Sequence, residues 1–116
     1  MDARRRTLAA QGAYYVATGV APFVSRRAFE AVTGPKREWW LVETVGVLVT
    51  AVGAGLLGGA ARNRVTPELL TIAGGCAAGL AGIDVVYVAR GRIAPAYLAD
   101  AAVQVALIAG LARAQR

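Results

Sequence analysis

Three acidic residues, Glu43, Asp84 and Asp100, lie inside segments that are otherwise apolar enough to be buried in a lipid bilayer. An ionisable side chain at that depth costs free energy, about 2.5–3.5 kcal/mol for Asp at the centre of a spanning helix. Such residues usually face the interior of a helix bundle, where they pair, bind a ligand or carry protons. Carboxylates placed in this way are suited to act as counter-charges for a cationic molecule.

The side chains that most enzymes use are missing or badly placed. The chain has no histidine, so it lacks the usual general base and the commonest metal ligand. Its only serine, Ser25, has no imidazole to activate it, and its only cysteine, Cys76, lies among Gly and Ala residues, where a thiolate is disfavoured. We therefore expect neither catalysis nor a metal or cofactor.

The composition favours lipid over water as the surrounding medium. Hydrophobic residues make up 57% of the 116 residues, against about 45–50% in soluble domains. Fourteen glycines would each destabilise a soluble helix by about 1 kcal/mol. In a membrane bundle, the same glycines allow helices to approach one another closely.

The net charge of +6 does not form a nucleic-acid surface, which would need cations gathered on one face. The cations instead come in short clusters between the apolar runs, as expected for helix ends anchored at lipid headgroups. Seven lie on the N-terminal side of the predicted spans and six on the other. This small excess predicts that both termini are cytoplasmic. The seven are Arg4, Arg5, Arg6, Arg62, Arg64, Arg113 and Arg116.

The pattern of apolar runs predicts an all-α fold, a bundle of four transmembrane helices that forms a single membrane domain over residues 1–116. A short interfacial helix is expected between the first two, because residues 28, 29 and 32 share an apolar face. A soluble bundle and a cleaved N-terminal signal peptide are the alternatives. The four spans are predicted over residues 7–25, 39–61, 68–89 and 96–112.

A faint internal repeat suggests that the bundle consists of two helical hairpins. Residues 15–22 resemble residues 87–95, and residues 40–43 resemble residues 97–100. The last two segments share the order aromatic residue, Leu, small residue, acid. Two hairpins in parallel orientation would produce this pattern. Coincidence in a chain rich in Ala and Val is the alternative explanation.

The depth of the three acids suggests a shared site. Each lies about 6–8 Å of helix rise from the same membrane surface, so all three belong to one leaflet. Polar or small residues extend from them at helical spacing. We expect these stripes to face inward and to enclose a cavity lined by Glu43, Asp84, Asp100, Tyr15, Thr18, Tyr87, Tyr97 and Gln104.

Two structural interpretations remain open. The acids can instead satisfy one another, the tyrosine hydroxyls, Arg90 or Arg92, and so only fix the helix register. Small residues at i and i+4 predict close helix packing, either inside the chain or in a homo-oligomer. The expected packing glycines are Gly46, Gly53, Gly55, Gly59, Gly75 and Gly79.

Residues 33–53, TGPKREWWLVETVGVLVTAVG, resemble the DoxX-like group of small bacterial membrane proteins. In that group, a Gly-Pro loop precedes a second helix that opens with a Glu and continues with spaced glycines. The resemblance implies four spans, an inner-membrane location and a role that is mostly unknown or accessory and redox-linked. Emopamil-binding-type domains are similar in architecture only, with acids in a membrane cavity that takes cationic amphiphiles.

These observations lead to two functional expectations. The first is a multi-pass protein of the bacterial inner membrane that binds or translocates a small amphipathic or cationic molecule in an acid-lined cavity. The second is an accessory subunit that packs through its Gly-rich helix faces in a larger membrane complex. Membrane lipids are expected partners in both cases, and nucleic acid in neither.

Overall fold

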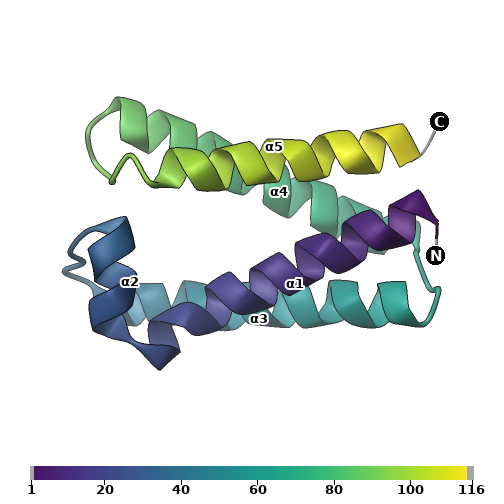
Figure 1. Ribbon diagram of the computed structural model, residues 1–116, viewed down its shortest axis with the longest axis horizontal. Coiled ribbons are helices and arrows are strands. Elements are labelled where there is room, and N and C mark those ends of the chain that lie inside the picture. Colours follow the sequence, from purple (N-terminus) through teal and green to yellow (C-terminus); the bar gives the residue numbers. More distant parts are fainter. Residues whose placement is uncertain (1, 115–116) are drawn as a thin grey trace.

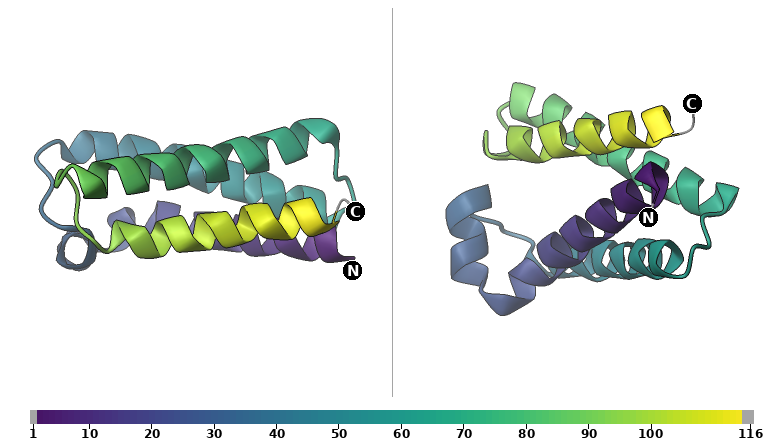
Figure 2. Two further views of the ribbon diagram at one scale, coloured as in Figure 1. Left: turned by 90° about the horizontal axis from the view of Figure 1, so that it is seen from above. Right: turned by 45° about the vertical axis from the view of Figure 1, so that its right-hand side comes forward.

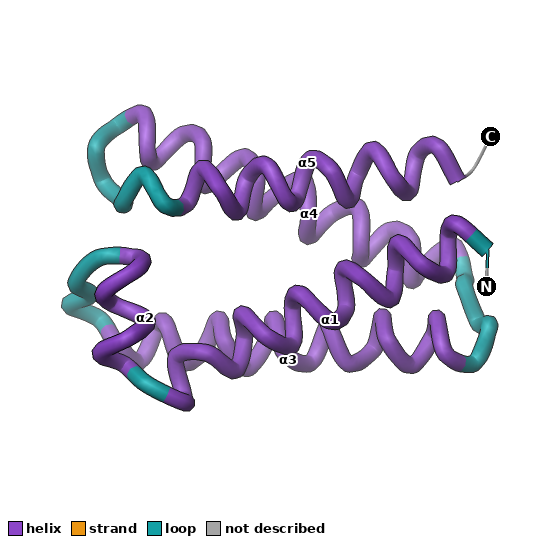
Figure 3. Tube along the Cα trace, viewed as in Figure 1, coloured by secondary structure: helices purple, strands orange, loops and turns teal. Residues whose placement is uncertain are grey.

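The computed structural model describes residues 2–114, which form five helices joined by short loops (Figure 1). No strand occurs in this part of the chain (Figure 3), so the predicted all-α class is confirmed. Arg116, one of the cations used to predict orientation, lies outside the described residues. The helices are α1 (Ala3–Val24), α2 (Arg26–Thr33), α3 (Trp39–Ala61), α4 (Pro67–Ala89) and α5 (Tyr97–Ala114).

Side-chain caps explain where two of the long helices begin. The Asp2 carboxylate accepts a hydrogen bond from the backbone N–H of Arg5 at 2.8 Å, so α1 includes the arginines and starts earlier than predicted. Thr66 caps α4 in the same way, accepting from the Leu69 N–H at 3.1 Å, with Pro67 at the first helical position. The bounds of α3 agree with the predicted second span.

The predicted short helix between the first two spans is present as α2. Its N-terminus is capped by Ser25, whose hydroxyl accepts a hydrogen bond from the Ala28 N–H at 3.1 Å. Gly34 ends the helix at φ +90°, a conformation that residues with a Cβ rarely adopt. No residue of α2 is fully buried, as expected for a helix on the surface of the bundle.

The long helices form two antiparallel pairs. α1 packs along α3, and α4 packs along α5. The pairs meet mainly where α1 touches α5, whereas α3 and α4 make few contacts. Figures 1 and 2 show the two pairs close together near the chain termini and spread apart near α2.

Glycines bring α1 and α3 close together at two points. A Cβ built on Gly12 would lie 2.8 Å from the carbonyl oxygen of Gly53, and one on Gly19 would lie 2.8 Å from that of Gly46. The reciprocal Cβ atoms would also meet backbone, at 2.7 Å. Because backbone atoms cannot rotate away as side chains can, no larger residue fits at these four positions.

The packing roles predicted for six glycines are therefore only partly found. Gly46 and Gly53 pack against α1, and a Cβ on Gly59 would lie 3.2 Å from the carbonyl oxygen of Arg64. Around Gly55, Gly75 and Gly79, no described atom lies within 4 Å of a built Cβ. These three glycines do not mediate close packing within the described chain, and Gly75 and Gly79 instead border an open space between α3 and α4.

The apolar core lies at the end of the molecule that carries the termini. Its buried members come from all four long helices, and Leu8 and Leu56 are fully inaccessible to solvent. The small side chains of Ala60 and Ala73 allow the helices to converge there. The cluster consists of Leu8, Tyr15, Leu56, Ala60, Ala73 and Leu111.

Two helices, α3 and α4, are long and apolar enough to cross a membrane. Only 17% of the apolar window of α3 and 22% of that of α4 is buried inside the protein. A core helix of a soluble protein would be mostly buried, whereas these helices turn large apolar side chains outward. Trp40, Leu48 and Ile83, for example, are 61%, 60% and 55% exposed.

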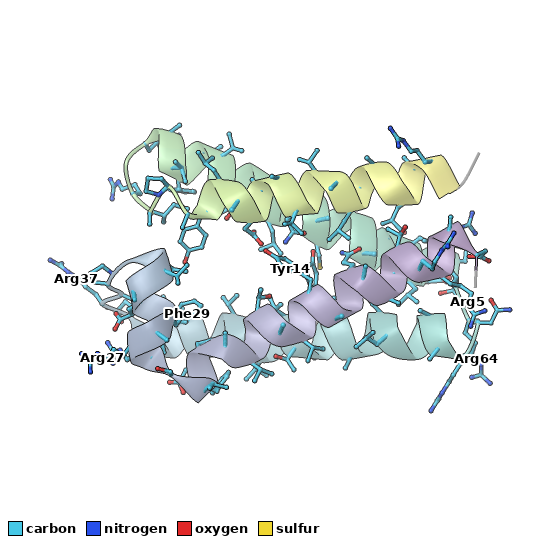
Figure 4. The ribbon with its side chains drawn as sticks, in the orientation of Figure 1. Arg5, Tyr14, Arg27, Phe29, Arg37 and Arg64 are labelled. Carbon is cyan, nitrogen blue, oxygen red and sulfur yellow. The ribbon has the colours of Figure 1, made fainter. Side chains whose placement is uncertain are left out.

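Cationic side chains gather at both ends of the molecule (Figure 4). Arg27 and Arg37 lie at the α2 end, and Arg5 and Arg64 at the opposite end. Arg5 also has a structural role there, since its Nε and Nη2 donate to the carbonyl oxygens of Ala60 and Ala61, at 2.8 and 3.4 Å. These carbonyls belong to the last turn of α3, where that of Ala60 also accepts from the Asn63 N–H at 3.3 Å.

Candidate functional site

A cavity of about 660 Å³ lies at the α2 end, where the two helix pairs spread apart. All five helices contribute to its wall. Its volume falls within the range of about 300–1,000 Å³ that is typical of small-molecule sites. Most of the wall is apolar, formed by residues such as Val45 and Val49 of α3, while the polar groups come mainly from α1, α4 and α5.

The polar groups form a hydrogen-bonded network centred on Asp100. The Tyr14 hydroxyl donates to Asp100 Oδ1 at 2.5 Å, and Gln104 Nε2 donates to the same oxygen at 3.3 Å. The Tyr15 hydroxyl in turn donates to Gln104 Oε1 at 2.7 Å. The network therefore joins α1 to α5, and Figure 4 shows Tyr14 reaching from α1 into the space between the helix pairs.

Asp84 of α4 faces this network and is the least satisfied acidic group in the site. Both Asp84 and Asp100 line the cavity. Only 5% of the residue is exposed, and no described group donates a hydrogen bond to its Oδ2. Buried polar atoms normally have a partner, so an unpartnered carboxylate oxygen beside a cavity indicates a place for a donor that binds there.

No cationic side chain lines the cavity in the described part of the chain. Arg90, one of the two arginines that could neutralise the acids, stacks on Tyr87, with 5.6 Å between its guanidinium carbon and the ring centroid. The one ion pair among residues 2–114 joins Arg26 to Glu30, outside the site. The Asp84–Asp100 pair therefore has no cationic partner within the described residues.

The structure brings together six of the eight residues that the sequence suggested for the site. Glu43 does not line the cavity, although Val42 beside it and Gly46 one turn further along α3 do. Tyr87 also lies outside, since it is one turn beyond Asp84 and packs with Arg90. The six residues that line the cavity are Tyr15, Thr18, Asp84, Tyr97, Asp100 and Gln104.

Tyr14 is a site residue that was not predicted from the sequence. The stripe chosen on the first span ran through Tyr15 and left Tyr14 on its border, although both tyrosines contact the network. The spacing of Gln11, Tyr14 and Thr18, at i, i+3 and i+7, is an equally good inward-facing pattern. Gln11 lies deeper and donates from Nε2 to the Ala73 carbonyl oxygen at 2.9 Å, which links α1 to α4.

The short helix α2 covers one side of the cavity, with Phe29, Val32 and Thr33 in the wall. Phe29 packs edge-on against Trp39 at the start of α3, with ring centroids 5.8 Å apart. Arg26 lies over the same indole ring, with its guanidinium carbon 4.7 Å from the centroid. These contacts hold α2 against α3.

A second set of contacts fixes the loop after α2. Glu30 accepts a hydrogen bond from the backbone N–H of Lys36 at 2.6 Å and pairs with Arg26 at 3.1 Å. The Lys36 N–H, followed by Arg26, holds the pKa of the Glu30 carboxyl below its ordinary value. Lys36 also approaches one residue of the cavity wall, since its Nζ lies 5.3 Å from the ring centroid of Tyr97.

Comparison of the chain with protein-family models, with curated proteins and with solved structures gives no match. The functional interpretation therefore depends on the residues and geometry of the cavity. Chemically, the arrangement offers two carboxyl groups, of which that of Asp84 is buried, with aromatic rings beside them and an apolar wall.

Proposed function

We propose that the chain is a four-span protein of the bacterial inner membrane that binds or translocates a small cationic or amphipathic molecule. The observation that carries this proposal is the Asp84 carboxylate, which is nearly inaccessible and has an unpartnered oxygen at an uncompensated, acid-lined cavity. A cation with N–H donors would supply both the missing charge and the missing hydrogen bond.

The length of α1 and α5 supports the assignment of four spans. With 22 and 18 residues, these helices rise about 33 and 27 Å, close to the hydrocarbon thickness of about 30 Å. They run antiparallel to α3 and α4, the more apolar pair. The cationic clusters at both ends of the molecule would then lie at the two headgroup layers.

The excess of cations near the termini favours cytoplasmic ends, and the cavity would then open toward the outer leaflet. Membership of the DoxX-like group is a further proposal, which rests on residues 33–53 alone. A reporter fused to the C-terminus tests the orientation. Activity of an extracytoplasmic reporter such as alkaline phosphatase would place the cavity on the cytoplasmic side instead.

Binding is tested with hexylamine, a small cation with an apolar tail, added to the purified protein in nanodiscs of deuterated lipid. Nuclear magnetic resonance should show saturation transfer from the protein to hexylamine, and an excess of a competing amine should reduce this signal. Transfer to 1-hexanol should be much weaker. Asp84→Asn should lower the affinity for hexylamine about tenfold or more, because a charge-assisted hydrogen bond is lost.

Glu43→Gln is the matched control, since Glu43 is the third acid at a similar depth but does not line the cavity. It should bind hexylamine as the unmodified protein does. Equal weakening by both substitutions, or equal binding of amine and alcohol, would reject the proposed site. Circular dichroism of each variant separates loss of binding from loss of the fold.

One observation supports the alternative function as an accessory subunit in a larger membrane complex. Four glycines of α4 have open space where a Cβ would be, so a helix of another protein or of a second copy could approach closely there. Cross-linking in native membranes tests this alternative, and Gly82→Leu should abolish any partner band that depends on this face. The four glycines are Gly74, Gly75, Gly79 and Gly82.

A further inference from the structure

A second cavity, of about 350 Å³, lies between α3 and α4. Its wall is almost wholly apolar and includes Leu48 and Val52 of α3 and Ile83 of α4. It exists because α3 and α4 make few contacts. Gly75 and Gly79 also lie in its wall, where a Cβ would meet nothing within 4 Å. We refer to this space as the α3–α4 groove.

The groove and the acid-lined cavity are adjacent. Four residues line both spaces, so at most a single layer of side chains stands between them. Tyr15 marks the junction, because its hydroxyl belongs to the polar network while the residue also borders the groove. The shared residues are Tyr15, Val45, Val49 and Leu80.

We infer that the ligand is a single-chain amphiphile, whose cationic head lies at Asp84 and Asp100 while its alkyl tail occupies the α3–α4 groove. This inference rests on the proposed function and adds to it the tail, its location and its route. Outward-facing side chains at the groove, such as Leu48 and Ile83, are 60% and 55% exposed. The tail can therefore enter sideways from lipid without passing α2.

The geometry also limits the length of the tail. Asp84 and Cys76 lie eight residues apart on α4, which corresponds to about 12 Å of rise. An alkyl chain of roughly ten carbons covers that distance, whereas a hexyl chain would end near the shared residues. Because the tail leaves one apolar medium for another, its contribution comes from packing and shape rather than from escape from water.

The test uses decylamine with a photoreactive diazirine at its last carbon, added to the full chain in nanodiscs and read by peptide mass spectrometry. We expect cross-links in residues 48–52 and 75–83, about tenfold stronger than with the corresponding alcohol, because only the amine is held by the carboxyl pair. The same label on hexylamine should mark the shared residues instead.

Two glycine substitutions on α4 provide a matched pair. Gly79→Leu fills the groove and should remove most of the decylamine cross-links, while hexylamine binding is retained. Gly82→Leu adds the same side chain to the same helix at an open position outside both cavities, and it should change neither result. Cys76 is the only thiol of the chain and lines the groove. The bound amine should therefore slow its alkylation, and this measurement requires no substitution.

The outcomes separate this inference from the proposed function. If hexylamine binds in an Asp84-dependent manner but decylamine labels residues of α2, the cavity is a cation site and the groove assignment is wrong. Equal labelling by amine and alcohol would mean that the groove takes any lipid chain, which also overturns the inference. Cross-links between two copies of α4 would show that a second protein occupies this face.

Discussion

The two ends of the molecule are built from the same four long helices but differ in how they are filled. At the terminal end, small residues such as Ala60 and Ala73 let the helices converge on Leu8 and Leu56, and Arg5 satisfies the last carbonyls of α3. At the α2 end, the helix pairs spread and leave a cavity lined by Asp84, which is buried, and by the partly exposed Asp100. The terminal end is closely packed, whereas the α2 end leaves polar groups beside open space.

Stability and function are therefore located mainly at different ends of the molecule. Buried, incompletely paired charges lower stability, so a site that retains them needs a rigid support elsewhere. The glycine contacts between α1 and α3 provide such support, because they extend from the packed end to Gly19 and Gly46 beside the cavity. We therefore expect disrupted packing to lower stability, and removal of the unpartnered Asp84 carboxyl at the open end to raise it.

The largest effect is expected from enlarging a glycine in the α1–α3 contact. Gly53→Val should lower the free energy of unfolding by about 3 kcal/mol or more, because the added atoms meet the Gly12 carbonyl and the Val16 N–H. Unfolding in a denaturing detergent, followed by circular dichroism, measures this loss. Gly55→Val, at an open position on the same helix, should change stability by no more than about 0.5 kcal/mol.

A smaller loss is expected when the cap on α3 is removed. Arg5→Ala should destabilise the protein by about 1–2 kcal/mol, because the Ala60 and Ala61 carbonyls lose a charged donor. The same unfolding assay applies. Arg6→Ala removes an equal charge from an exposed position and serves as the control. Similar losses in both variants would indicate a general charge effect rather than a cap.

At the open end, the sign should reverse. Asp84→Leu should raise the free energy of unfolding by about 1 kcal/mol, since it removes a buried oxygen that has no partner, and it should abolish amine binding. Asp100→Leu should instead lower stability, because Tyr14 and Gln104 lose their acceptor. A loss of stability in the Asp84 variant would contradict the view that this acid is kept for function.

The smallest effect is a pH dependence in the α2 region. The pKa of Glu30 lies below its ordinary value in the folded protein, so its stabilising effect is complete above that ordinary value. It is lost as the pH falls through the lowered pKa. In a Trp40→Phe background, Trp39 fluorescence should report α2 leaving α3 on this acid limb, and Glu30→Gln should flatten the profile between neutral and acidic pH.

Helix positions were the easiest feature to predict from the sequence. The Thr66-Pro67 cap and the break at Gly34 define boundaries through local hydrogen bonds and backbone geometry, which a sequence displays directly. The predicted start of α1 was wrong, because the Asp2 cap allows the helix to include charged residues. An apolar run therefore shows which part of a helix suits lipid, but not where the helix ends.

The site was harder to predict, because spacing identifies which residues share a helix face but not what that face meets. The stripe through Glu43, Gly46 and Gly53 was expected to line the cavity, whereas only Gly46 does so, and both glycines contact α1. Asp84 and Asp100 could be paired from their depth alone, since α4 and α5 are joined by a short loop. Tyr14 and Tyr15 are neighbours in sequence, and only the crossing of α1 over α5 shows that both take part.

The spreading of the helix pairs has a consequence for the surrounding bilayer. A protein that is narrow near its termini and broad near α2 (Figures 1 and 2) displaces unequal areas of lipid from the two monolayers once it spans them. Such a wedge lowers its energy where the membrane bends toward its narrow side. Copies that span a membrane would therefore favour regions curved in this sense, independently of any ligand.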